Sequence, residues 1–123
     1  MKAITISTDN EIKKIEVEQN GSPLYDLMRE AVGGWYELVH PRRLPAKYVM
    51  IVNEEGLILR LDKNAIGSYL YETDKHGSPI VGNIIFLKND RFDGEPDVVG
   101  LSDDEADELM TLFERLKGEI NND

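Results

Sequence analysis

Four side chains between residues 40 and 47 form a cationic cluster in a chain that is otherwise acidic: His40, Arg42, Arg43 and Lys47. Proline before and after the two arginines restricts the backbone of this stretch. Guanidinium groups held in place suit a phosphate or a carboxylate, and His40 would add a proton switch. We interpret the cluster as a candidate site for a small anionic ligand. The alternative is a solvated turn whose arginines pair with the acidic C-terminal segment.

The acidic side chains concentrate towards the C-terminus. Of the net charge of −10, residues 88–123 carry −8, because they hold 12 of the 24 acidic side chains and four of the 14 basic ones. Such asymmetry can steer a basic partner. We select Asp103, Asp104, Asp107 and Glu108, together with Trp35, as a candidate partner surface. The alternative is a solvated helix face that only keeps a small protein soluble.

A calcium loop is the nearest match to a metal site. Asp93, Glu95, Asp97 and Asp104 occupy its relative positions 1, 3, 5 and 12. Such a loop needs glycine at position 6, where this chain has Val98, and a longer Glu as its last ligand. We therefore predict no metal site.

The best grouping for nucleophilic catalysis is a single loop that contains Asp74, His76 and Ser78. A triad needs a base that reaches the nucleophile and a third group that orients the base, and nothing in this loop indicates that arrangement. His76, which precedes a glycine, is more simply a turn residue. We find no catalytic constellation and predict no enzyme; a hydrolase would have only scattered His, Asp and Ser residues in its support.

Composition excludes further classes. The chain has no cysteine, and therefore no disulfide framework, thiolate zinc site, iron–sulfur cluster or cysteine nucleophile. We predict no cofactor. The acidic balance argues against direct nucleic-acid binding and against anionic membranes. Because the first residues lack the long apolar run of a signal peptide, we expect a cytoplasmic protein.

The elements that would position these residues fit one domain, residues 1–123. Hydrophobic periodicity predicts strands at 4–6, 14–18, 35–40, 48–52, 57–61 and 80–87, and helices at 23–32, within 63–72 and at 102–118. Residues 88–100 are expected to form an acidic loop. Ile12 is out of phase with Ile15 and Val17, so a bulge or a strand start is expected near Lys13.

The order β-β-α-β-β-β-α-β-α predicts an α+β domain, in which a mainly antiparallel sheet carries its helices on one face. Ser22 is the expected cap of the first helix and Asn64 that of the second. Ser102 and Glu105 match a capping box before an apolar stripe. That last helix must dock on the sheet, because burial of its stripe is what can stabilise it.

Five stretches of the chain stand out as motifs: residues 32–39 (VGGWYELV), 48–57 (YVMIVNEEGL), 64–68 (NAIGS), 80–85 (IVGNII) and 101–105 (LSDDE). Together they resemble the segments of a domain-of-unknown-function family, DUF3846. The resemblance covers most of residues 1–116 and implies a protein of phages, plasmids or conjugative elements of Gram-positive bacteria. It implies no activity and no catalytic residues.

Two functions follow as expectations. The first is an accessory protein of a mobile element that binds a host or phage protein, in one version by occupying a basic, DNA-binding surface. The second is a small-molecule binder for a nucleotide-like anion, which would use Arg42, Arg43, Lys47 and a strand aromatic.

Overall fold

The computed structural model describes residues 1–75, 77–92 and 95–121. The elements follow the order β-β-α-β-β-α-β-β-α. Their bounds are β1 (Lys2–Ile6), β2 (Ile12–Glu16), α1 (Ser22–Val32), β3 (Tyr36–Val39), β4 (Tyr48–Asn53), α2 (Ala65–Tyr71), β5 (Ile84–Phe92), β6 (Glu95–Val99) and α3 (Asp103–Asn121). Six strands and three helices make an α+β domain, so the predicted fold class is confirmed.

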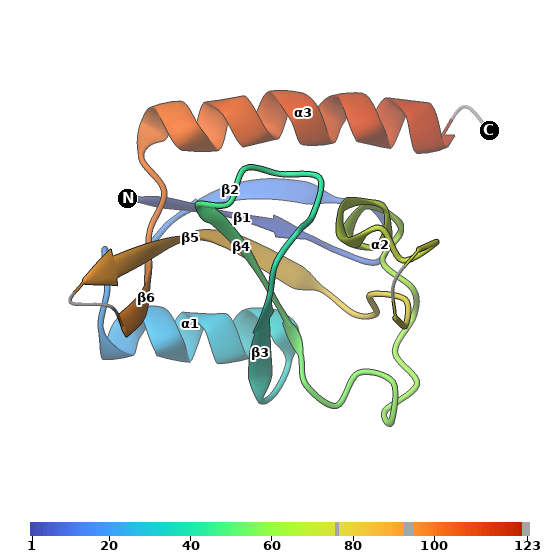
Figure 1. Ribbon diagram of the computed structural model, residues 1–123, viewed down its shortest axis with the longest axis horizontal. Helices are drawn as coiled ribbons and strands as arrows, with labels where there is room; N and C mark the ends of the chain where they lie inside the picture. Colours follow the sequence, from blue (N-terminus) through green and yellow to red (C-terminus); the bar gives the residue numbers. More distant parts are fainter. Residues whose placement is uncertain (76, 93–94, 122–123) are drawn as a thin grey trace.

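All strand pairs in the six-stranded sheet are antiparallel, and the strand order is β2-β1-β5-β4-β3. The long strand β5 pairs with β1 and β4 and continues into a hairpin with β6. Figure 1 shows this hairpin reaching beyond the body of the sheet. β3 closes one end of the order, next to β4.

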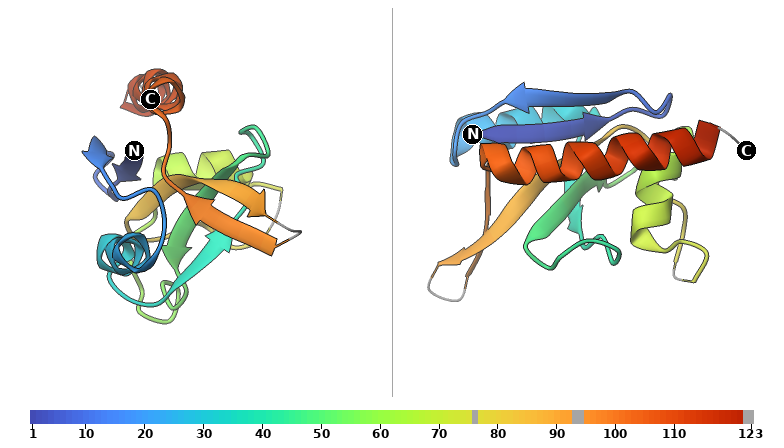
Figure 2. Two further views of the ribbon diagram at one scale, coloured as in Figure 1. Left: turned by 90° about the vertical axis from the view of Figure 1, so that its left-hand side faces the viewer. Right: turned by 90° about the horizontal axis from the view of Figure 1, so that it is seen from above.

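Helices cover both faces of the sheet. α1 buries Leu24, Met28 and Val32 against one face, whereas α2 and α3 pack on the other (Figure 2). The expectation that the helices share one face is therefore wrong. Its physical reason is visible in β4, where all six residues are buried, because adjacent side chains enter opposite cores.

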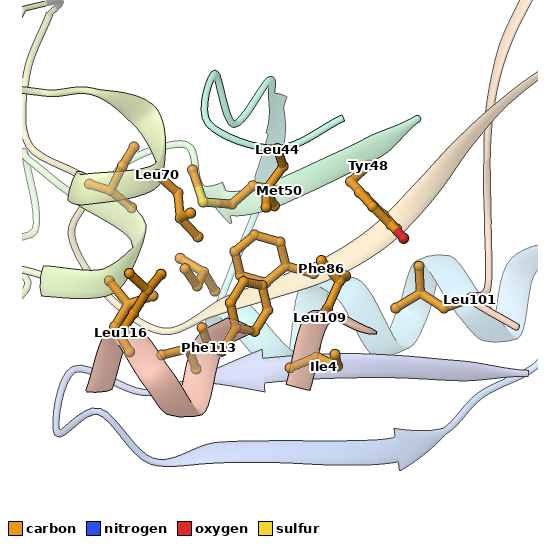
Figure 3. Close-up of a cluster of buried hydrophobic side chains, with 14 of the residues drawn as sticks. Ile4, Leu44, Tyr48, Met50, Leu70, Phe86, Leu101, Leu109, Phe113 and Leu116 are labelled. Atoms are coloured by element: carbon orange, nitrogen blue, oxygen red, sulfur yellow. The ribbon is translucent and has the colours of Figure 1, made fainter. Parts of the chain in front are cut away.

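The C-terminal helix begins where the capping box predicts. Ser102 N–H donates to Glu105 Oε1 (2.9 Å) and Glu105 N–H donates to Ser102 Oγ (3.1 Å). The predicted stripe docks on the sheet, and the Phe113 ring lies 4.7 Å from the Phe86 ring, centroid to centroid (Figure 3). Burial of such side chains contributes roughly 1.5–3 kcal/mol each, which is what holds α3 in place.

One strand lies elsewhere than predicted. Residues 57–61, expected as a strand, belong to a turn that spans 54–60 and its exit. Part of the expected acidic loop at 88–100 instead forms the end of β5 and all of β6. The alternation of Leu57, Leu59 and Leu61 mimics a strand, but the first two point into solvent.

Two helix starts test the predicted caps. Asn64 caps α2, since its side-chain oxygen accepts from Gly67 N–H at 3.0 Å. Ser22 does not cap α1: the capping residue is Gly21, whose φ of 89° favours glycine and whose carbonyl accepts from Leu24 and Tyr25.

Candidate functional site

A groove of about 400 Å³ opens beside β3, on the face of the sheet that α2 and α3 cover. Its walls come from β3, the end of β4, the 54–60 turn and the segment that follows α2. We call it the β3 groove; its lining residues are Glu37, Val39, Val52, Asn53, Glu54, Gly56, Leu57, Ile58, Tyr71, Ser78, Pro79, Ile80 and Val81.

The 54–60 turn, which forms one wall of the groove, is held in place by contacts with neighbouring segments. Asn53 is buried; its side-chain nitrogen donates to Val32 O (3.0 Å) and its oxygen accepts from Glu55 N–H (2.8 Å). Gly56 leaves no room for a side chain, since a Cβ there would lie 2.7 Å from Val81 Cγ2. The turn is therefore anchored both to α1 and to the segment after α2.

Exposed apolar side chains concentrate on the β3 side of the sheet, where two of them, Leu57 and Ile58, line the groove. Of the seven large apolar side chains exposed among the described residues, five lie on β3, directly before it, or on the turn after β4. We call these five the β3 apolar patch: Trp35, Leu38, Leu57, Ile58 and Leu59. Ile58 is 81 % exposed although it is fully aliphatic. A cluster of this kind typically marks an interaction surface.

Two carboxylates lie on the rim of the groove. Glu37 on β3 and Glu54 at the start of the turn both line it, and its lining contains no lysine or arginine. In the described part of the chain, neither carboxylate forms an ion pair. The groove therefore offers an apolar floor together with uncompensated negative charge.

Family comparison agrees with the resemblance noted in the sequence. The model of a family described as a domain of unknown function, DUF3846, matches residues 1–114. The chain belongs to this family. No curated protein and no solved structure matches it. The matched part of this DUF3846 domain includes the β3 groove, the β3 apolar patch and the start of α3.

The predicted cationic cluster of this DUF3846 domain divides between two places. Arg43 lies over the Tyr69 ring, 4.1 Å from its centroid, and faces Glu72 (3.7 Å) and Asp74 (3.9 Å). Lys47 instead contacts Glu105 at the start of α3 (3.2 Å). His40 and Arg42 are exposed.

Glu105 connects this cluster to the sheet. Its carboxylate faces both Lys47 Nζ and Lys88 Nζ at 3.2 Å, and it accepts from the Ser102 backbone. Burial alone would raise the pKa of Glu105, but these hydrogen bonds outweigh burial and lower the pKa to about 2. The hydrogen bond to Glu105 also raises the pKa of Lys47. These groups hold α3 against β4 and β5.

The predicted partner surface is likewise divided. Asp103, Asp104, Asp107 and Glu108 are exposed at the start of α3, where Asp107 pairs with Lys14 of β2 (3.0 Å). Trp35 lies between α1 and β3, and its ring lies 5.3 Å from the guanidinium of Arg29 in α1. Trp35 therefore belongs with β3 rather than with the acidic residues.

Other sequence patterns fall partly outside the described residues. His76 does so, as do Asp93 and Gly94 of the calcium-like loop. In the part of the chain that the structure covers, no three His, Cys, Asp or Glu side chains cluster in a way that could hold a metal ion. Within the same residues, no helix has the length and apolar character needed to cross a membrane.

Sequence reasoning missed the β3 groove. The strand expected at residues 57–61 placed Leu57 and Leu59 on one strand face, whereas both are exposed on a turn. The available signals were the turn residue Gly56 and the apolar Ile58, which breaks the strict alternation of residues 57–61.

Proposed function

We propose that this domain is a non-enzymatic accessory protein that acts by binding another protein through the β3 side of its sheet. The observation that supports this is the concentration of exposed apolar side chains in the β3 apolar patch. A monomer gains nothing in stability by leaving aliphatic side chains in water, whereas burial against a partner would recover roughly 25 cal/mol per Å². In this proposal the protein serves a phage or another mobile element and works in the cytoplasm.

A basic partner suits both surfaces of the molecule. The β3 groove carries two carboxylates, and the start of α3 presents Asp103, Asp104, Asp107 and Glu108 to solvent. With a net charge of −10, the chain attracts cationic proteins at long range. In our proposal the acidic surface accelerates the encounter, while the apolar patch supplies the affinity.

Site-directed photocrosslinking in the native host tests this proposal. A benzophenone amino acid replaces Ile58 or Leu38 in two variants, Asp104 in a third, and Glu114 on the outer face of α3 in a control. We expect one protein to crosslink from positions 58 and 38 and not from position 114. That protein, once purified, should bind the wild-type chain at least tenfold more tightly than the Ile58→Asp variant, with Glu114→Gln unchanged.

Two results would contradict the proposal. If the crosslink yield at positions 58 and 38 did not exceed the yield at position 114, the β3 side would not be the binding surface. A partner that crosslinks only from position 104 would show that the acidic surface of α3, and not the β3 side, is the binding surface.

Binding of a small anion is the second candidate, and a different observation favours it. Arg43, Lys63, Tyr69 and Thr73 line a shallow hollow, and the buried Thr73 hydroxyl has no hydrogen-bond partner in the described structure. An anion there would have to displace the carboxylates that now face Arg43. Thermal-shift screening with a nucleotide panel tests it: ligand at a hundredfold its Kd adds about 2.7 kcal/mol, and Arg43→Ala should abolish the shift.

A further inference from the structure

The outer edge of β3 presents free backbone groups. β3 ends the sheet order, and no other strand in the described structure pairs with it. Glu54 N–H donates to Trp35 O at 2.9 Å, and bonded pairs alternate along an antiparallel ladder. The next bonded pair is therefore Glu37 with Val52, so Tyr36 and Leu38 direct their N–H and C=O groups away from β4. A strand laid along β3 would meet these groups.

Apolar side chains flank this edge on both faces of the sheet. Leu38 shares its face with Tyr36, which packs on the α1 side, and it is exposed because α1 does not cover it. On the opposite face, Val39 lines the β3 groove together with Leu57 and Ile58. An added strand alternates its side chains between the two faces, so its apolar residues would find apolar surface on either side.

The negative charge of the groove favours a basic binding partner over a second copy of this chain. Glu37 and Glu54 line the groove, and no cation of the described residues pairs with either, so an occupant with lysine or arginine would compensate them. A second copy of this chain would do the opposite. A twofold β3–β3 pairing would bring both acidic rims together between two molecules of charge −10, and like charges across paired strands are destabilising.

We propose that β3 receives an extended segment of a basic partner as an added sheet strand, with apolar residues in the β3 groove and a lysine or arginine between Glu37 and Glu54. This inference rests on the proposed protein-binding function and specifies its mode. β3 is four residues long, so the added strand would pair over only a few residues, and its side-chain contacts would supply the specificity.

The test uses fluorescein-labelled ten-residue peptides and fluorescence anisotropy. The probe alternates valine with lysine; its counterpart alternates valine with glutamate. We expect the lysine peptide to bind at least tenfold more tightly than the glutamate peptide. Adding it should shift the ¹⁵N amide signals of Tyr36 and Leu38, whose N–H groups would become bonded.

Matched variants separate the groove from general attraction to an acidic protein. The double variant Glu37→Gln/Glu54→Gln and the control Glu114→Gln/Glu119→Gln change the net charge equally, and all four side chains are exposed. We expect the groove variant to weaken the lysine peptide at least tenfold and the control variant less than twofold. A lysine peptide methylated at alternate backbone nitrogens should also lose at least tenfold in affinity, because it cannot pair as a strand.

Three outcomes would overturn strand addition: equal weakening by both double variants, unchanged binding of the methylated peptide, or a concentration-dependent dimer in sedimentation that Ile58→Ser abolishes. The first two leave the proposed function standing if position 58 still crosslinks to a partner. The dimer would show that a second copy occupies the edge. Failure of the crosslinking, by contrast, would end the protein-binding proposal itself.

Discussion

Replacement of Glu105 by glutamine should weaken the attachment of α3 to the sheet in a pH-dependent way. The carboxylate faces two lysines at 3.2 Å and accepts from Ser102, and the Glu105 side chain is only 13 % exposed. Its pKa of about 2 lies below the ordinary 4.5. At about 1.4 kcal/mol per pKa unit, this difference corresponds to about 3 kcal/mol of stability at pH 7.

The direction of the pH effect follows from the lowered pKa. Stability from Glu105 is fully present above the unfolded-state pKa of 4.5 and is lost as the pH falls towards 2. By pH 3 the contribution falls to about 1.4 kcal/mol. The amide of glutamine can still accept from Ser102 N–H, so we expect Glu105→Gln to cost about 2 kcal/mol at pH 7. The cost should be less than half of that at pH 3.

Urea denaturation of the wild-type protein and of the Glu105→Gln variant at pH 7, 5, 4 and 3 measures how the cost of the substitution changes with pH. Glu114→Gln is the matched control, because it changes the same functional group at an exposed position of the same helix, and we expect its effect to stay within about 0.5 kcal/mol. A cost for Glu105→Gln that is the same at pH 7 and pH 3 would refute the argument. It would mean that the charge of Glu105 does not stabilise the fold.

Three further substitutions test the packing, each by urea denaturation at pH 7. Gly67→Ala should destabilise by about 1–3 kcal/mol, because its Cβ would lie 2.8 Å from Ile84 Cδ1; a neutral result would show that the site can relax. Gly118→Ala in α3 meets nothing within 4 Å and should stabilise by about 0.5–1 kcal/mol; a loss of stability would contradict this. Phe113→Ala should cost about 3–5 kcal/mol, because the ring is fully buried against Phe86; a cost below about 1 kcal/mol would show that α3 is not docked as described.

Local signals predicted the helices well. The capping box of Ser102 and Glu105 and the cap at Asn64 depend on residues at most three apart, so the sequence displays them directly. Gly33 ends α1 in the left-handed conformation, with φ of 80°, which glycine adopts without steric cost. Such interactions form within one turn of chain and do not depend on the rest of the fold.

Non-local packing explains what the sequence could not predict. Ile12 is out of phase with Ile15 because it packs towards α3, whereas Ile15 packs towards α1. Of the two expectations near Lys13, the strand start is confirmed, since β2 begins at Ile12, and the bulge is wrong, since β2 pairs in regular register with β1 from Ile12 to Glu16. A strand covered on both faces loses the alternation that marks a one-sided sheet.

The candidate site was hidden for a related reason. Leu57 and Leu59 have the composition and spacing of a strand, and only the tertiary fold leaves them in solvent. β6 carries Glu95, Pro96 and Asp97, all unusual in strands, and it forms because β5 offers it a partner. In both segments the tertiary environment overrides local preference.

The position of β5 has a consequence for synthesis on the ribosome. The two earlier strand pairs, β1–β2 and β3–β4, have no direct link in the sheet, and β5 joins them. A nascent chain that has not yet reached Ile84 lacks the strand that joins these two pairs, so their apolar faces have no sheet to complete. Closure of the sheet therefore waits for the last third of the chain, and in that interval the growing polypeptide is most exposed to chaperones and proteases.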